Sequence, residues 1–284
     1  GTANLVLNAG AIFLDGERVA QIVPNRPPLF PQLQLEKALN DVPTEARKHL
    51  LTTAEAWLEA LIQPLAPLRR IDEASRSTEA GPELRALLIA LVEQGGMMER
   101  EGSRLDQLDK EQRTRLAKIG VKVGTLDIYV PAMLRPESIR LWRNLKGMAA
   151  TEDGLIDTMP PTLPASKNQR PRGYRSLGKQ WIRLDMAEKI LREAHAARVP
   201  AARRPFPLDP ARAVSMGLTV ASHDRLLRLA GFQPNQPRSL PEGAFGPPTP
   251  TRWRWRPIRQ KQTPEAPVSA LTNSAFAALS ALVR

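Results

Sequence analysis

The apolar pattern of residues 119–145 changes twice, and each change coincides with a proline. Apolar and polar side chains alternate over 121–130, which is typical of strands with one buried face. Pro131 interrupts this alternation. Pro136 stands where a first helical residue would stand, because the N–H that proline lacks has no intrahelical partner at that position. The apolar residues behind it recur at helical spacing: Ile139, Leu141, Trp142 and Leu145. The stretch therefore predicts strands, a turn and a helix in close succession, with a structural rather than a ligand-binding role.

A second strand pattern lies near the N-terminus, over residues 11–23. Apolar residues alternate on both sides of Asp15 and Gly16. The Asp-Gly pair suits the type I′ turn of a two-residue hairpin, because both turn positions need a positive φ. We therefore expect a β-hairpin here.

Three helices are expected between the hairpin and residue 119. The first covers 44–65, with Thr44 as its N-cap. The second covers 82–98 and ends at two glycines, and Asp109 caps a third that ends at Lys118. Because helical stretches outnumber strands, the expected fold class is mainly α with small antiparallel β elements, in the α+β class.

The second half of the chain predicts a different kind of unit. Residues 148–180 are rich in proline and basic residues and predict a linker. A helix is expected over 181–197, and two short helices over 210–216 and 222–230 have the spacing of a helix–turn–helix. A strand over 251–259 would complete the order of a winged-helix domain. Helical hairpins of this size also occur without any nucleic-acid role, so both interpretations stay open.

Positive charge is concentrated in this second half. Residues 1–150 contain 20 Lys and Arg against 19 Asp and Glu, whereas residues 151–284 contain 21 against 10. The overall net charge of +12 therefore comes almost entirely from one half. A field of that sign attracts polyanions, of which nucleic acid is the commonest. A merely solvated surface is the alternative explanation.

The strand over 251–259 alternates tryptophan with arginine. One face would carry Trp253 and Trp255, as core residues or as stacking surfaces for bases, and the other face would carry arginines that can pair with phosphate. The candidate nucleic-acid-binding residues are Arg203, Arg204, Arg225, Arg228, Arg252, Trp253, Arg254, Trp255, Arg256 and Arg259.

No self-contained catalytic constellation is visible. The chain has no cysteine, and its three histidines, His49, His195 and His223, show no metal-ligand spacing. It has no Gly-rich phosphate loop with a following Lys-Ser/Thr, and the acidic segment 72–75 is expected to be a solvated turn rather than a magnesium box. We therefore predict no catalytic residue, no metal site and no cofactor within this chain. An unrecognised hydrolase is the least favoured alternative.

Four segments resemble the C-terminal region of bacterial superfamily-two (DExH) helicases of the suppressor-of-Var type, best known from the mitochondrial RNA degradosome. They are GAIFLDGERVAQI, the stretch IGVKVGTLDIYVPAMLRPESIRLWRNL, WIRLDMAEKI and TPTRWRWRP, and they occur in the same order as in those relatives. The ending NSAFAALSAL also resembles the tail of the relatives. Within the central stretch, the matching positions are Gly120, Val121, Gly124, Pro131, Ala132, Leu134, Pro136, Arg140, Leu141 and Trp142.

The resemblance implies a piece of an ATP-dependent helicase that lacks both RecA-like motor lobes. ATP and magnesium would then be bound by those lobes and not by this chain, so whether the chain counts as part of an enzyme depends on its parent. The expected domains are a helical domain with a small sheet over 1–147, the linker over 148–180, a basic winged-helix-like domain over 181–260, and a tail over 261–284 with a short amphipathic helix.

Two functions of different classes follow from these observations. The first is a nucleic-acid-binding accessory region that guides a single strand of RNA or DNA and braces the RecA-like lobes. The alternative is a protein-interaction module that docks through the first-half helices and the C-terminal helix. No apolar run is long enough to span a membrane and no signal peptide is recognisable, so a cytoplasmic location and no membrane partner are expected.

Overall fold

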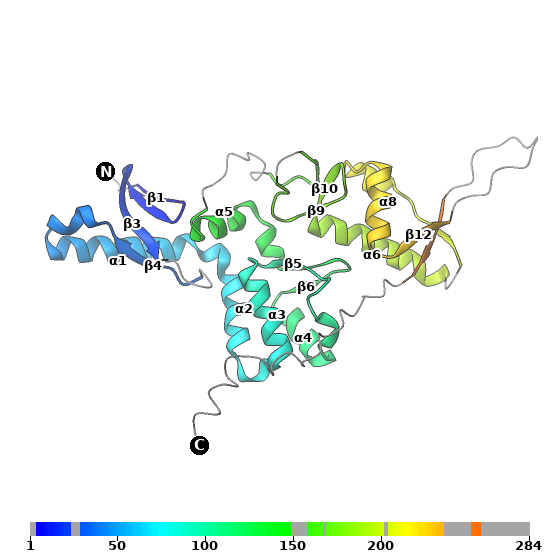
Figure 1. Ribbon diagram of the computed structural model, residues 1–284, viewed down its shortest axis with the longest axis horizontal. Helices are drawn as coiled ribbons and strands as arrows, with labels where there is room; N and C mark the ends of the chain where they lie inside the picture. The colour runs from blue at the N-terminus through cyan, green and yellow to red at the C-terminus, as the bar shows by residue number, and fades with distance from the viewer. Residues whose placement is uncertain are drawn as a thin grey trace, which may run out of the picture.

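The computed structural model describes residues 4–23, 29–148, 158–166, 169–201, 204–235 and 251–256. These residues form a mainly helical structure with small antiparallel sheets, as the α+β expectation stated. Figure 1 shows the first sheet and α1 at one end of the molecule, α2 to α4 in the middle, and α6, α8 and β12 at the other end. The expected tail over 261–284 lies outside the described residues.

The N-terminal hairpin is confirmed as part of a four-stranded antiparallel sheet. Asp15 and Gly16 have φ angles of 50° and 93°, the positive values that the turn requires. The backbone N–H of Asn4 donates to Asp15 Oδ1, which ties the sheet edge to the turn. The strands follow each other in space in chain order: β1 (Leu5–Asn8), β2 (Ala11–Leu14), β3 (Glu17–Val23) and β4 (Gln32–Leu35).

The helices of the first half lie at the expected positions, although not with all of the expected ends, except that the helix over Ala66–Arg76 was not predicted. Thr44 is the first residue of α1 and not its cap, since Pro43 holds the N-cap position without a side-chain hydrogen bond. Asp109 does cap α4, in a reciprocal capping box with Gln112. The helices are α1 (Thr44–Leu61), α2 (Ala66–Arg76), α3 (Gly81–Glu93), α4 (Lys110–Lys118) and α5 (Pro136–Leu145), with 3-10 turns at Lys37–Asp41, Gln63–Leu65, Thr78–Ala80, Leu105–Gln107 and Pro131–Leu134.

The segment expected to be a solvated turn, residues 72–75, lies in the helix α2 instead. Asp72 and Ser75 are buried, and Asp72 pairs with Arg76 one turn later. The reason is that Pro67 falls in the first turn of α2, where proline starts a helix rather than ending one.

The second predicted helix is shorter than expected. It ends at Glu93, and residues Met97–Glu99 form the strand β5. Gly95 and Gly96 turn the chain between them with φ angles of 62° and 81°. A Cβ at Gly95 would lie 2.5 Å from the indole Nε1 of Trp142, so this turn also needs glycine for space.

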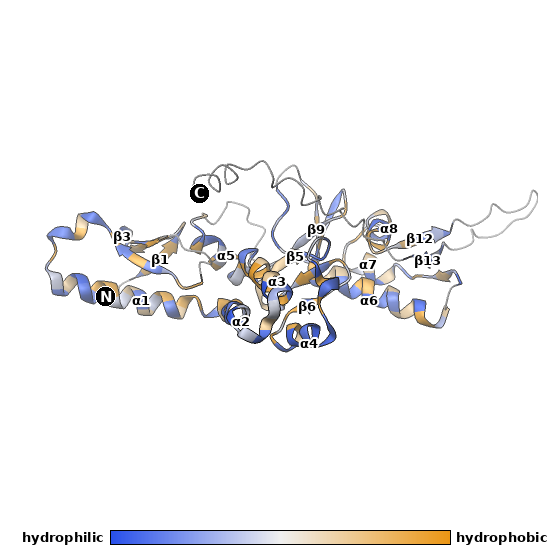
Figure 2. Ribbon diagram, turned by 60° about the horizontal axis from the view of Figure 1, so that its bottom comes forward, coloured by the Kyte–Doolittle hydropathy of each residue, from blue (hydrophilic) through white to orange (hydrophobic). Residues whose placement is uncertain are grey.

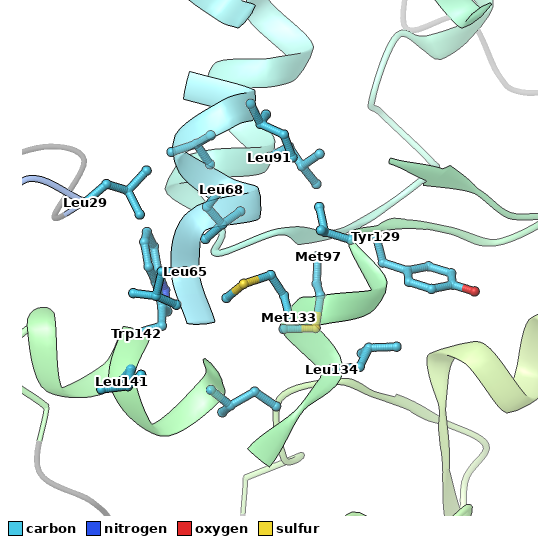
Figure 3. Packing of buried hydrophobic residues seen from close by; sticks show 14 of the residues in the cluster. Leu29, Leu65, Leu68, Leu91, Met97, Tyr129, Met133, Leu134, Leu141 and Trp142 are labelled. Carbon is cyan, nitrogen blue, oxygen red and sulfur yellow. The ribbon is translucent and has the colours of Figure 1, made fainter. Parts of the chain in front are cut away.

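Residues 119–145 have the structural role that their pattern predicts. β6 (Lys122–Val123) and β7 (Asp127–Tyr129) pair antiparallel, β5 joins β7 on its other edge, and α5 begins at Pro136. Trp142 is only 1% exposed. Figure 3 shows its ring among the buried side chains Leu29, Leu65 and Leu141, with Met133 nearby. In Figure 2 the hydrophobic colour is strongest around α3 and β5, in the middle of the molecule.

The described residues of the expected linker over 148–180 belong to the fold. They contribute β8 (Thr162–Pro164) and β9 (Tyr174–Ser176), which pair on either side of β10 (Gln180–Arg183). Met159, Leu163 and Tyr174 are buried in the first hydrophobic core. The proline-rich composition was misleading because these prolines flank short strands rather than separating two domains.

Strand β10 connects two hydrophobic cores. Trp181 was expected to start a helix, but it lies in β10 and packs in the first core, while its neighbour Ile182 packs in the second. Successive side chains of a strand point to opposite faces, so one strand serves both cores. The second core is completed by α6 (Leu184–Ala201), β11 (Phe206–Pro207), α7 (Ala211–Ser215), α8 (Val220–Leu229), β12 (Phe232–Asn235) and β13 (Arg252–Trp255).

Candidate nucleic-acid interface

Strand β13 presents a row of arginines on one face of a small sheet. It lies between β11 and β12, and its side chains alternate in exposure, with Arg252, Arg254 and Arg256 exposed. The partner of Arg254 in the register is Gln233, which is also exposed. The outer face of this sheet is therefore polar and positively charged.

The two tryptophans of β13 point toward the second core. Trp253 is 2% exposed, so the prediction that it contacts nucleic acid is wrong for the folded domain: no ring face is accessible to a base. Trp255 is partly buried. Its indole Nε1 donates to the Ala230 carbonyl at 3.1 Å, and the guanidinium of Arg198 lies 4.0 Å from its ring centroid. Both rings anchor the strand, and Trp255 already has a cation stacked on it.

Helix α8 adds a second exposed basic stretch. Thr219 caps it, and its side chain accepts a hydrogen bond from the Ser222 N–H. The inward residues Leu226 and Leu227 are fully buried, whereas Arg225 and Arg228 are exposed. A helix with this pattern presents its basic side chains to solvent on the face opposite the core.

The end of β13 lies beside the end of α8. The Arg256 N–H donates to the Gly231 carbonyl at 2.8 Å, and the Gly231 N–H donates to the Arg228 carbonyl at 3.0 Å. The fold thus brings the last basic residue of the strand close to the last turn of the helix. We refer to the exposed arginines of α8 and of the β13 segment together as the arginine face: Arg225, Arg228, Arg252, Arg254 and Arg256.

The five arginines of the arginine face form no ion pairs within the part of the chain that the structure describes. The contrast is with the first half of the chain, where exposed and half-buried arginines do pair: Arg18 with Glu36, Arg69 with Glu59, Arg76 with Asp72, Arg100 with Asp106, and Arg115 with Glu79 and Glu111. The guanidinium groups of the face are therefore available to an external anion.

Three candidate residues of the loops are less informative. Arg203 and Arg259 lie outside the described residues. Arg204 is exposed just before β11, and its backbone N–H donates to the Ala201 carbonyl at 2.9 Å. It lies two residues before β11, the strand that pairs with β13.

Two polar contacts that the sequence did not indicate fix this region to the first half. Arg175 on β9 pairs with Asp127 on β7, and the Thr125 N–H donates to the carboxylate of Glu188 on α6 at 2.6 Å. Burial raises the pKa of Glu188, and the hydrogen bond from Thr125 acts in the opposite direction. Gly124 leaves room for this contact, since a Cβ there would lie 2.7 Å from Glu188 Oε2. Arg175 and Asp127 are 48 positions apart in the sequence, and Thr125 and Glu188 are 63 apart, so no local sequence pattern predicts either contact.

Two further arginines, Arg143 and Arg172, were also missed. Each has a buried Nε with no hydrogen-bond partner among the described residues. In the sequence they look like ordinary surface cations.

The described residues contain no group of three or more His, Cys, Asp or Glu side chains that could hold a metal ion. Nor do they include a helix with the length and apolarity needed to cross a membrane. No protein-family model, curated protein or solved structure matches the chain. The argument for function therefore depends on the arrangement of the residues themselves.

Proposed function

We propose that the chain is a nucleic-acid-binding accessory region, and that it belongs to the C-terminal part of a helicase of the suppressor-of-Var type. The observation that carries the proposal is the arginine face, in which five exposed guanidinium groups on α8 and β13 have no carboxylate partner among the described residues. Unpaired guanidinium groups match phosphate oxygens in charge and in hydrogen-bond geometry.

We further propose that the residues around the second core form a winged-helix domain. Its support is the order α6, β11, α7, α8, β12, β13 along the chain, and the order β11-β13-β12 in the sheet. In domains of this kind, the second helix of the helix–turn–helix and the strands that follow it contact the nucleic acid. The arginine face involves the equivalent elements, α8 and β13.

Contacts of this type bind the backbone and do not read sequence. Arginines that pair with phosphates release counterions, so affinity falls steeply with salt and differs little between sequences. With Trp253 buried and Trp255 covered by Arg198, stacking on these two rings makes no contribution. The role proposed for the region is to guide a single strand of RNA or DNA that leaves the motor.

The nearly neutral first half fits a bracing role against the RecA-like lobes of the parent helicase. Those lobes would bind ATP and magnesium. The buried acid Asp72 is paired with Arg76, and the described residues contain no group of three or more His, Cys, Asp or Glu side chains that could hold a metal ion.

A protein-interaction module is the second candidate function. One observation favours it: Ile89 on α3 is 44% exposed and lines a pocket of about 410 Å³ with Val92 and Arg85. Under this alternative, Ile89→Asp would abolish self-association or the binding of a protein partner and leave nucleic-acid binding unchanged.

The experiment is a titration of the full chain into labelled single strands and tailed duplexes of RNA and DNA at several salt concentrations. We expect binding at low salt that weakens as salt rises and depends little on sequence. If binding is missing at low salt, or is indifferent to salt, the proposal is wrong.

A further inference from the structure

A pocket formed by both halves of the chain is lined by basic, apolar and acidic side chains. It has a volume of about 610 Å³ and lies between the end of α3, strand β5, helix α5 and residues 169–174. Its cations are Arg143, Lys146, Arg170 and Arg172, and its apolar residues include Met97, Met98 and Trp142. This pocket is separate from the arginine face.

Two of its arginines carry buried donors that no described residue satisfies. The Nε atoms of Arg143 and Arg172 are inaccessible to solvent and have no hydrogen-bond partner among the described residues. A buried charged donor without a partner costs more than a neutral one, typically above about 1–3 kcal/mol. Native structures rarely keep two such groups side by side unless something else satisfies them.

The fold makes a specific place for Arg172. Its Nη2 lies so close to Gly95 that a Cβ there would be 2.6 Å away, and the same Cβ would meet the Trp142 ring. The turn after α3 therefore needs glycine partly because the guanidinium occupies that space. Arg143 comes from α5, one residue after Trp142, and lines the same pocket.

The two guanidinium groups also repel each other. Burial, and then the positive charge of Arg143, lower the pKa of Arg172. An anion bound between them would relieve this repulsion.

The carboxylates around the pocket do not serve as that anion. Asp127 is engaged by Arg175 through both oxygens. Glu99 lies 3.7 Å from Arg170, a loose contact with both side chains about half-exposed. Glu93 lines the pocket, yet it forms no ion pair with Arg143 or Arg172 in the described part of the chain.

We propose that this pocket binds a phosphate group, with Arg143 and Arg172 as the primary ligands and Arg170 at the exposed edge. Guanidinium groups donate two parallel hydrogen bonds to phosphate oxygens, and apolar walls such as Met97 and Met98 strengthen these bonds by excluding water. The phosphate comes either from the backbone of a nucleic-acid strand or from a free phosphate or nucleotide.

The test measures the thermal midpoint of the full chain in inorganic phosphate, against sodium chloride of matched ionic strength. Phosphate should raise the midpoint of the wild-type chain. Arg172→Met keeps the packing against Trp142 and removes the donors, so it should abolish this increment, or weaken phosphate affinity by at least about tenfold. Without phosphate its midpoint should equal or exceed that of the wild type, because an unsatisfied buried charge is gone.

Two companion variants make the result specific. Arg143→Met should also lose the phosphate increment, which keeps the test meaningful if one variant fails to fold. The triple variant R252Q/R254Q/R256Q should retain the phosphate increment. The proposal for the arginine face and the proposal for this pocket can therefore be rejected independently of each other. The proposal is overturned if phosphate and chloride act alike on the wild type, or if Arg172→Met keeps the full increment.

Competition then separates the two sources of the phosphate. An oligonucleotide without terminal phosphates should displace inorganic phosphate from the wild-type pocket if a strand backbone is the ligand. If only inorganic phosphate or a mononucleotide competes, the pocket binds a free phosphate group.

Discussion

Arg175 and Asp127 form a two-point ion pair between strands β9 and β7. Arg175 Nε donates to Asp127 Oδ2 at 2.8 Å, and Nη2 donates to Oδ1 at 2.7 Å. Nη2 also donates to the Leu126 carbonyl at 3.1 Å, so the guanidinium satisfies both a side chain and the backbone. Both side chains are nearly buried, with 12% and 8% of their surface exposed. Arg175 belongs to residues 148–180, which were expected to form a linker, and Asp127 belongs to residues 119–145 of the first half. The pair therefore joins these two segments.

Breaking this pair should destabilise the chain strongly. Arg175→Met leaves the Asp127 carboxylate buried without its cation, which typically costs about 3–5 kcal/mol. The measurement is the free energy of unfolding from denaturant titration. The exposed pair Arg212–Glu193 is the control, and Arg212→Met should cost no more than about 1 kcal/mol. Equal effects at the two sites would contradict the structural role assigned to Arg175.

Gly124→Ala should weaken the junction between the two halves. The new Cβ would lie 2.7 Å from Glu188 Oε2 and 2.9 Å from the Asp127 carbonyl, which the Gly124 N–H itself contacts at 2.8 Å. Overpacking of this kind costs about 1–3 kcal/mol. In the double variant G124A/E188A the side-chain clash is absent. Its loss in free energy of unfolding should therefore be smaller than the sum of the losses in the two single variants. Strict additivity would show that the two residues are not in contact.

Trp253→Ala should act on folding and not on the ligand directly. Removing a buried indole from the second core costs about 3–5 kcal/mol, whereas Arg254→Gln on the exposed face should change stability by less than about 0.5 kcal/mol. Arg254→Gln should nevertheless weaken binding of a single strand. If the Trp253→Ala protein unfolds at the same denaturant concentration as the wild type but no longer binds the single strand, the ring must contact nucleic acid.

The second core should lose stability in mildly acidic solution. Burial, together with the charge of Arg198, lowers the pKa of His195, and burial lowers the pKa of His223 although Asp224 and Asp209 act in the opposite direction. A histidine with a lowered pKa binds its proton more readily in the unfolded chain. Stability therefore falls as pH drops through the ordinary histidine value of 6.5.

The measurement for this prediction is the free energy of unfolding as a function of pH. The wild type should lose stability below a pH of about 6.5, and the variant H195Q/H223Q should show a flatter profile over the same interval. His49→Gln, on the exposed surface of α1, is the control and should keep the wild-type profile.

Local signals in the sequence identified much of the fold. The Asp15-Gly16 turn, the Asp109 cap and the Pro136 helix start each depend on residues within a few positions, and each is confirmed. The alternation of Trp253 with its neighbouring arginines also gave the correct faces of β13. Such features depend on backbone geometry that a few adjacent residues determine.

Contacts between residues far apart in the chain could not be predicted from the sequence. The proline-rich stretch looked like a linker because its strands are only three residues long and are stabilised by pairing with β10. The unsatisfied Nε atoms of Arg143 and Arg172 result from the way α5 packs against residues 169–174. The composition of the sequence does not predict this packing. The winged-helix order and the helicase resemblance stay predictions.

The measurement that tests the central claim most directly is the salt dependence of single-strand binding by the wild type and by R252Q/R254Q/R256Q. Each phosphate contact contributes about 0.7 to the slope of log K against log salt, so removal of three contacts should reduce the slope by about 2. K110Q/K118Q/K122Q removes the same charge from exposed positions in the first half and should leave the slope unchanged. If the two triple variants have the same slope as each other, the arginine face does not bind the strand.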